Sequence, residues 1–386
     1  MKFRASPPLK PSHWQTSVPT PTPCPALQGD HHADVAIVGG GFVGLWTALT
    51  IRELEPDCRV SIVEQHLCGS GASGRNGGFA MSWWPKIGTL RALCGDDEAR
   101  FLGQQSEKAI FDLGEFCARH GIDAHFTQKG WLWTATSPAH VDTWNGTLAA
   151  CAALGAAPFQ RLSGEEVRRR TGSPTHLAGV FEASNATVQP YALVQGMRRV
   201  ALDAGVTIFE NSPVRRIEPG APVRLITDGG TLAADRVVLA TNAWSAAIPE
   251  LARLFTPVNS SIVVTRPLGA QLDRIGWTGG ESICDAQSHV LYYHRTPGGR
   301  VIFGRGSGLI AYGGRIGAPF NRRPEGAADN IRELGRVYPE LANARIDHDW
   351  TGPIDCMAEH LPVFGTLSSC PNIFFGVGYN GTGIAR

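Results

Sequence analysis

The sequence lacks three features that would each mark a distinct class of protein. No run of about 18 apolar residues occurs, so nothing predicts a membrane span. Charge of one sign is not in excess: 35 basic and 34 acidic residues leave a net charge of +1, which gives no electrostatic case for binding nucleic acid or an anionic membrane. Paired cysteines are also missing. The nine cysteines are an odd number with no C-x-x-C pair, which favours reduced thiols and a cytoplasmic location over a disulfide framework.

Lysine is scarce as well. Only five of the 35 basic residues are lysines, and the last of them is Lys129, so few lysines are available as catalytic bases.

The chain does contain enough apolar residues, 43%, for a substantial core. Its 386 residues are enough for about two domains. The first 30 residues are rich in Pro, Thr and Ser and predict an extended arm.

Strands and helices alternate after the arm. The apolar run 33–41, stopped by glycine, predicts a buried parallel strand. A helix at 42–54 and a second strand at 59–64 follow. A sheet-rich block interrupts the middle of the chain, which predicts two interleaved domains. Further helices are expected at 96–120, 138–154, 189–205 and 325–341, and further strands at 130–136, 235–244, 289–295, 300–306 and from 372.

The first strand leads into the pattern G-x-G-x-x-G, formed by Gly39, Gly41 and Gly44 with Phe42 between the last two. Gly39 allows a tight turn, Gly41 lets a pyrophosphate approach the backbone, and Gly44 lets helix and strand pack closely. Glu64 ends the second strand about 20 residues later, where it would accept hydrogen bonds from the adenosine ribose. The full βαβ context favours dinucleotide binding over a glycine-rich turn without a ligand.

The motif alone does not separate NAD from FAD. A second glycine-rich stretch, "GSGASGRNGGF" (69–79), begins five residues after Glu64. A flavin ring and its ribityl chain need packing from such a second segment, so the stretch favours FAD. Two alternatives stay open at this point. One is an NAD-dependent dehydrogenase, and the other is a flavin-binding partner subunit without its own turnover.

Six blocks in order along the chain resemble the FAD-dependent amine and amino-acid oxidases of the D-amino-acid oxidase/glycine oxidase superfamily, and most of all the γ-glutamylputrescine oxidase-like branch. The blocks are "ADVAIVGGGFVGL", "GASGRNGG", "VVLATNAW", "TPVNSSIVVTRPL", "YYHRTPGGRVIFGRG" and "WTGPIDCMAEHLPVFG". With the strand pattern, the resemblance implies an α/β fold with a Rossmann-like FAD-binding domain and an interleaved, sheet-rich α+β substrate domain. The expected divisions are an arm of 1–32, an FAD-binding domain of 33–120, 187–250 and 351–386, and a substrate domain of 121–186 and 251–350.

The resemblance implies that the second glycine-rich loop closes around the flavin. Arg75 could instead make a surface salt bridge, and Asn76 could simply form a turn. Val214 would present its backbone to the adenine, and Thr241 would pass close to the cofactor, although both could be ordinary core or turn residues. The loop residues expected near the flavin are Ser73, Arg75, Asn76, Gly77 and Gly78.

The implied chemistry is oxidation of a C–N bond in a small amine or amino acid. A hydride passes to flavin N5, the imine hydrolyses, and oxygen or another acceptor takes the electrons. Tyr292 is the first candidate for the substrate wall, with Arg305 as a partner for a substrate carboxylate and His360 close to the flavin. Plain sheet packing, a solvated arginine and a structural histidine are the respective alternatives. No metal site is expected.

Two departures from relatives matter. The monomeric sarcosine oxidases of this superfamily place a lysine near N5 to activate oxygen, whereas no lysine follows Lys129 here. An oxidase and a dehydrogenase with another acceptor therefore both stay open. The same relatives attach FAD to a cysteine of the last block. Cys356 lies in that block but is offset from the attachment position, so we expect non-covalent FAD.

The segment "GVGYNGTGIAR" (376–386) resembles the family stretch that delivers a helix N-terminus to the flavin pyrimidine edge. Unpaired N–H groups there would stabilise negative charge on the ring; a plain strand-to-helix turn is the alternative. Because the helix would have barely begun at Arg386, we expect either a chain shortened relative to its natural form or a poorly ordered end. The residues expected at the flavin are Asn380, Gly381, Thr382 and Gly383.

Overall fold

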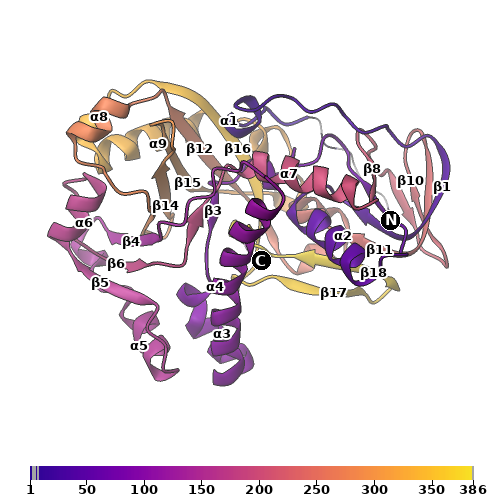
Figure 1. The fold of residues 1–386 in the computed structure, drawn as a ribbon, viewed down its shortest axis with the longest axis horizontal. Helices are drawn as coiled ribbons and strands as arrows, with labels where there is room; N and C mark the ends of the chain where they lie inside the picture. The colour runs from indigo at the N-terminus through magenta and orange to yellow at the C-terminus, as the bar shows by residue number, and fades with distance from the viewer. Residues whose placement is uncertain (2–5, 7, 385–386) are drawn as a thin grey trace.

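The computed structural model describes residues 1, 6 and 8–384, and two eight-stranded sheets dominate it (Figure 1). The main path of the first sheet has the order β17-β18-β11-β1-β2-β8. β1 pairs in parallel with β2 and β11, and all three are rich in buried Val, Ile and Ala. The eight strands of this first sheet are β1 (Gly29–Val38), β2 (Val60–Val63), β8 (Thr207–Phe209), β9 (Arg216–Glu218), β10 (Val223–Ile226), β11 (Gly230–Leu239), β17 (Val363–Leu367) and β18 (Cys370–Val377).

Helices α2 (Phe42–Leu54) and α7 (Pro190–Asp203) pack against each other beside this sheet. The range predicted for α2 is confirmed residue for residue, because glycine marks its start and the apolar periodicity marks its length. β1 begins at Gly29, four residues earlier than the predicted strand.

The second sheet has the order β16-β12-β15-β14-β13-β4-β6-β5. Helix α9 (Pro324–Val337) packs on β12 and β15. β16 crosses the predicted domain boundary at 350, because its pairing with β12 continues as far as Cys356. The domain division itself stays a prediction. The strands are β4 (Trp131–Ala135), β5 (Phe159–Ser163), β6 (Ala178–Glu182), β12 (Thr256–Thr265), β13 (Ser282–Asp285), β14 (Leu291–Arg295), β15 (Val301–Ile310) and β16 (Ile346–Cys356).

The remaining helices lie outside the two sheets. In Figure 1, α3, α4 and α5 form a projection at the bottom of the view. The helix predicted at 138–154 is shorter in the structure, since α5 begins only at Asn145. The bounds are α1 (His13–Thr16), α3 (Ile87–Cys94), α4 (Asp96–Arg119), α5 (Asn145–Ala153), α6 (Gly164–Thr171) and α8 (Gly269–Arg274); a short pair, β3 (Phe79–Ala80) and β7 (Ala186–Thr187), completes the fold. No helix among the described residues is both long and apolar enough to cross a bilayer.

The N-terminal arm lies against the body of the protein rather than extending from it. A buried carboxylate, Glu210, fixes one part of it. Its Oε2 accepts the N–H of Cys24 in the arm at 2.7 Å, and its Oε1 accepts the N–H of Cys68 at 2.8 Å. The Arg198 guanidinium neutralises the carboxylate at 2.8 Å, with side-chain exposures of 11% for Arg198 and 0% for Glu210. One ion pair therefore joins the arm, α7 and the segment before the glycine-rich loop.

We expect the change Arg198→Met to lower the free energy of unfolding by about 3–5 kcal/mol, because it leaves the Glu210 charge buried without its partner. Arg199→Met is the matched control. Arg199 pairs with Asp203 on the surface, at exposures of 52% and 68%, so its loss should change the free energy by no more than about 0.5 kcal/mol. Urea unfolding of both variants measures this, and equal losses would contradict the assignment.

Candidate functional site

A cavity of about 620 Å³ lies between the two sheets. On one side it meets the carboxyl ends of β1, β2 and β11, where ligands bind in open parallel sheets. On the other side it is lined by parts of β12, β14, β15 and β16. Sixteen of the nineteen residues predicted for the site line it: Gly39, Gly41, Phe42, Glu64, Ser73, Arg75, Asn76, Gly77, Val214, Thr241, Tyr292, His360, Asn380, Gly381, Thr382 and Gly383.

The glycines of the G-x-G-x-x-G turn occupy positions where a side chain would not fit. Gly39 has φ +114° and faces the carbonyl of Ala240, which an added Cβ would approach to 2.5 Å. Gly44 does not line the cavity. A Cβ there would lie 2.0 Å from the Gly39 carbonyl oxygen, in agreement with a role in close helix–strand packing. At Gly41 an added Cβ would fill the space next to the Ser73 hydroxyl, at 2.7 Å.

Ser73 connects the two glycine-rich segments. Its hydroxyl accepts the N–H of Phe42 at 2.9 Å, which is the first amide of α2. The loop is thus bound to the positive end of the helix, where anions are favoured. This contact requires the glycine at position 41.

Glu64 lines the cavity at the end of β2. Its Oε2 accepts the N–H of Gly40 at 2.8 Å, and its Oε1 accepts the N–H of His66 at 3.0 Å. Burial raises its pKa, and these two hydrogen bonds oppose that shift. Each carboxylate oxygen keeps acceptor capacity for a hydroxyl group. Val214 lies in the same lining.

The two polar side chains of the loop mainly make contacts with the protein backbone. Asn76 donates to the carbonyls of Ala72 and Ser73 at 3.2 and 2.9 Å and accepts the N–H of Gly78 at 2.8 Å, so it forms a turn. Gly78 packs against the Val188 carbonyl and lies outside the lining.

Arg75 is 3% exposed, so the alternative of a surface salt bridge is wrong. Its Nε and Nη2 donate to the Thr351 carbonyl at 2.9 and 2.6 Å, and its Nη1 donates to the Lys10 carbonyl at 2.6 Å. Burial lowers its pKa to about 10. At neutral pH the guanidinium is still charged and connects the loop to β16 and to the arm.

One face of β14 lines the cavity, and the other face packs in the core of the protein. Tyr292 faces the cavity, with its hydroxyl 2.7 Å from Ser260 Oγ. Its ring lies over Gly77 and Gly304, where added Cβ atoms would come within 3.0 and 2.2 Å of it. Tyr293 points the other way, into the core, and its hydroxyl lies 2.8 Å from His176 Nε2.

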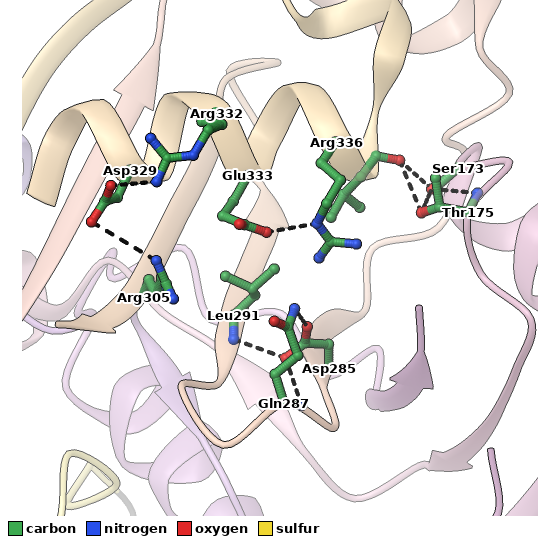
Figure 2. A network of polar contacts seen from close by, with 11 residues as sticks. Ser173, Thr175, Asp285, Gln287, Leu291, Arg305, Asp329, Arg332, Glu333 and Arg336 are labelled. Atoms are coloured by element: carbon green, nitrogen blue, oxygen red, sulfur yellow. Dashed lines mark hydrogen bonds and ion pairs between the residues drawn. The ribbon is translucent and has the colours of Figure 1, made fainter. Parts of the chain in front are cut away.

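Arg305 corrects a prediction. It lies on the α9 face of β15, where its guanidinium pairs with Asp329 at 3.8 Å (Figure 2). Gly306 and Gly308 of the same strand line the cavity, whereas Arg305 does not. The geometry does not support its predicted contact with a substrate carboxylate, because the strand alternation places its side chain on the opposite face of the sheet.

His360 lies at the exposed rim with φ 55°, and its carbonyl accepts a hydrogen bond from Lys86 Nζ. The final glycine-rich segment lines the cavity, and its contact with the flavin stays a prediction. Asn380 has φ 52° and accepts the N–H of Met357 at 2.8 Å. No helix begins by Ile384. The predicted helix start beyond that point, and the expectation of a poorly ordered end, fall on residues 385 and 386, outside the described residues.

Sequence reasoning missed Asp355. This carboxylate is fully buried, lines the cavity, and accepts the N–H groups of Gly378 and Tyr379 at 2.6 and 3.2 Å. Burial raises its pKa to about 6. The signal in the sequence is a lone acid at the end of the apolar stretch "WTGPID". Asp355 holds the turn that carries the final glycine-rich segment against the cavity.

The family model described as FAD dependent oxidoreductase (DAO) matches residues 34–385. This chain belongs to that family. It is 29% identical over 94% of its length to the probable oxidoreductase OrdL of Haemophilus influenzae and 27% identical over 97% to the gamma-glutamylputrescine oxidoreductase of Escherichia coli, covering 81% and 85% of those proteins. The crystal structure of glycine oxidase from Geobacillus kaustophilus matches with a TM-score of 0.71 at 22% identity, over 92% of this chain and 91% of that one.

Family membership confirms the α/β fold class, the FAD cofactor and the resemblance read from the sequence, including its branch. The chain is an FAD-dependent oxidoreductase of a family that acts on amines or amino acids. NAD as the cofactor and a role without turnover, left open above, are thereby set aside. The residues present fit FAD, because the cavity joins the helix end at Phe42 to Tyr292 through a cradle that side chains at Gly41 and Gly77 would fill.

We expect Asp355→Asn to change how stability depends on pH. The folded-state pKa of about 6 lies above the ordinary value of 3.8, so the folded state binds more protons between these two values. The contribution of Asp355 to stability is therefore complete below pH 3.8 and is lost as the pH rises through 6. Urea unfolding of the apoprotein from pH 4 to pH 7 should show this decline in the wild type and a flatter profile in the variant. Parallel profiles would contradict the assignment.

Proposed function

We propose that this protein oxidises a C–N bond in a small amine that carries no carboxylate at the reacting carbon, with FAD bound non-covalently. One observation carries the choice of an amine. Among the described residues that line the cavity, Arg75 is the only lysine or arginine, and its guanidinium is bound to backbone carbonyls of Thr351 and Lys10. A carboxylate would find no uncommitted cation there. We call the part of the cavity beside Tyr292 the chamber. It is lined by the apolar side chains of Phe79, Met81 and Cys284.

The relatives support both the reaction class and its nearest alternative. The Escherichia coli relative is by name an oxidoreductase for gamma-glutamylputrescine, whose name denotes an amine derivative, whereas glycine oxidase is named for an amino acid. Oxidation of an amino acid is therefore the second candidate. A cytoplasmic location also stays a proposal, which rests on the nine unbridged cysteines.

FAD, when bound, supplies the hydride acceptor and passes the electrons on to oxygen or another acceptor. The protein then has to position an amine and keep it uncharged. Burial raises the pKa of Tyr292, so its hydroxyl stays protonated and, held by Ser260, can donate a hydrogen bond into the chamber or accept one from an amine N–H. Asp355 and Glu64 are the other charged groups of the lining; they are engaged with backbone N–H groups, so neither is a free general base.

The proposal of non-covalent FAD rests on the chemistry of Cys356. This residue lines the cavity, but burial raises the pKa of its thiol to about 11. The thiolate, which is the nucleophilic form, is therefore scarce at neutral pH. We expect acid precipitation of the yellow protein to release all the flavin into the supernatant. Flavin that stays on the precipitated chain would contradict non-covalent binding.

The test of substrate class is anaerobic bleaching of the flavin by a panel of amines and amino acids. We expect amines without an α-carboxylate to bleach it, and their α-carboxylated analogues to be slower by at least tenfold. If the carboxylated analogues are the faster substrates, the second candidate replaces the first. If no compound bleaches a protein that binds FAD, the proposed reaction fails.

We expect Tyr292→Phe to lower kcat/KM for the best amine about three- to tenfold, the effect of one hydrogen bond, while FAD stays bound. Tyr293→Phe on the neighbouring position is the control, since its hydroxyl lies in the core. That variant should lose stability and keep its kinetics. Unchanged kinetics in Tyr292→Phe would remove Tyr292 from the substrate wall.

A further inference from the structure

Four buried side chains that do not line the cavity form a layer against the glycine-rich loop, and each faces one of four consecutive loop carbonyls. Ser12 Oγ donates to the Gly74 carbonyl at 2.6 Å, and Trp350 Nε1 donates to the Arg75 carbonyl at 2.7 Å. Trp14 Nε1 donates to the Asn76 carbonyl at 2.8 Å. We call Ser12, Trp14, His294 and Trp350 the backing layer; His294 Nε2 lies 3.1 Å from the Gly77 carbonyl.

The backing layer is a packed unit. Its four side chains are between 0% and 3% exposed. The Trp14 ring stacks on His294 at 6.3 Å and 15° and meets Trp350 edge-on at 6.2 Å and 72°. Gln189 of the α7 cap holds the Trp14 carbonyl at 2.8 Å. The Trp14 indole therefore has little freedom to move without the loop.

Two of the four members come from the N-terminal arm, which lies more than 60 residues from the loop in sequence. A third contact joins the same segments, since Arg75 Nη1 donates to the Lys10 carbonyl at 2.6 Å. The arm thus holds residues 74–76 at three successive positions. The same loop touches the Tyr292 ring at Gly77.

We propose that Ser12 and Trp14 are positioning residues for the flavin, which act by fixing the carbonyls of residues 74 and 76 and so the face that the loop presents to the cavity. The inference rests on the proposed role of this loop in holding FAD. Carbonyls that are already hydrogen-bonded to the backing layer are held in one orientation, so the peptide groups of the loop present a fixed edge to the cofactor. Loss of a backing contact would let the loop shift toward the space that the ring system and Tyr292 share.

The test compares Trp14→Phe with Trp277→Phe. Both changes remove an indole and leave a phenyl ring in a buried site. Trp277 Nε1 has no hydrogen-bond partner among the described residues. The residue lies in the core of the second sheet, so its loss removes packing but none of the hydrogen bonds found there. Apoprotein of each variant is titrated with FAD by flavin fluorescence, and the reduction potential of the bound flavin is measured.

We expect Trp14→Phe to raise the Kd for FAD about three- to tenfold, the value of one hydrogen bond, and to shift the reduction potential. Trp277→Phe should change neither beyond error, although both variants lose thermal stability. Ser12→Ala is a smaller change and should also raise the Kd for FAD. It serves as the test if Trp14→Phe fails to fold. Equal Kd values and potentials for the tryptophan pair, or no effect of Ser12→Ala, would overturn the proposal.

Binding linkage gives an independent readout. If the arm holds the loop for FAD, FAD must in turn hold the arm. Chymotrypsin cleavage after Trp14 should therefore slow when FAD is added to the wild-type apoprotein. An unchanged cleavage rate at saturating FAD would contradict the inference. A wild-type apoprotein that takes up no FAD at all would instead refute the proposed function on which the inference rests.

Discussion

The glycine-rich loop at 71–79 can face a polar ligand only because its own backbone is satisfied elsewhere. A buried carbonyl without a partner costs roughly 1–3 kcal/mol, and this loop has four in succession at 74–77, each met by a side chain of the backing layer. Asn76 satisfies further backbone groups from within the loop. With these carbonyls paired, the flexible glycine-rich backbone is held in one conformation. A loop that binds a cofactor needs such a fixed surface.

The same constraint links parts of the molecule that belong to different sheets. Ser73 binds the loop to the start of α2 beside the first sheet, while Trp350 and His294 bind it from β16 and β14 of the second sheet. Arg75 adds the Thr351 carbonyl. The loop therefore connects the dinucleotide side of the cavity to the chamber beside Tyr292. Because it is hydrogen-bonded to both parts, a displacement of either sheet would also displace the loop.

Local patterns allowed the dinucleotide half to be predicted from the sequence. The glycine spacing, the helix behind it and Glu64 lie within about 30 residues, so the tight turn, the helix and an acid beside the same cavity could be predicted together. Residues far apart in sequence were harder. Strand alternation puts Tyr292 and Tyr293 on opposite faces of β14, but the sequence alone does not say which face lies inward. The predicted contact of Arg305 with a substrate carboxylate was wrong for the same reason.

Asp355 and the arm were missed for a different reason. A lone aspartate at the end of an apolar strand has no local pattern that predicts which amides it will bind, since Gly378 and Tyr379 lie more than 20 residues further on. An arm rich in proline predicts an extended chain, which is correct locally. Nothing in its composition indicates that Ser12 and Trp14 pack behind a loop 62 residues away.

A crystal structure of the protein reconstituted with FAD tests the central claim most directly, namely that one cavity takes the whole cofactor between Glu64 and Tyr292. We expect the ribose hydroxyls of the adenosine to lie within hydrogen-bond distance of the Glu64 carboxylate. The pyrophosphate should lie at the start of α2, and the flavin ring should contact the loop at 75–77 beside Tyr292. A flavin ring bound away from Tyr292, or a ribose turned away from Glu64, would contradict this account.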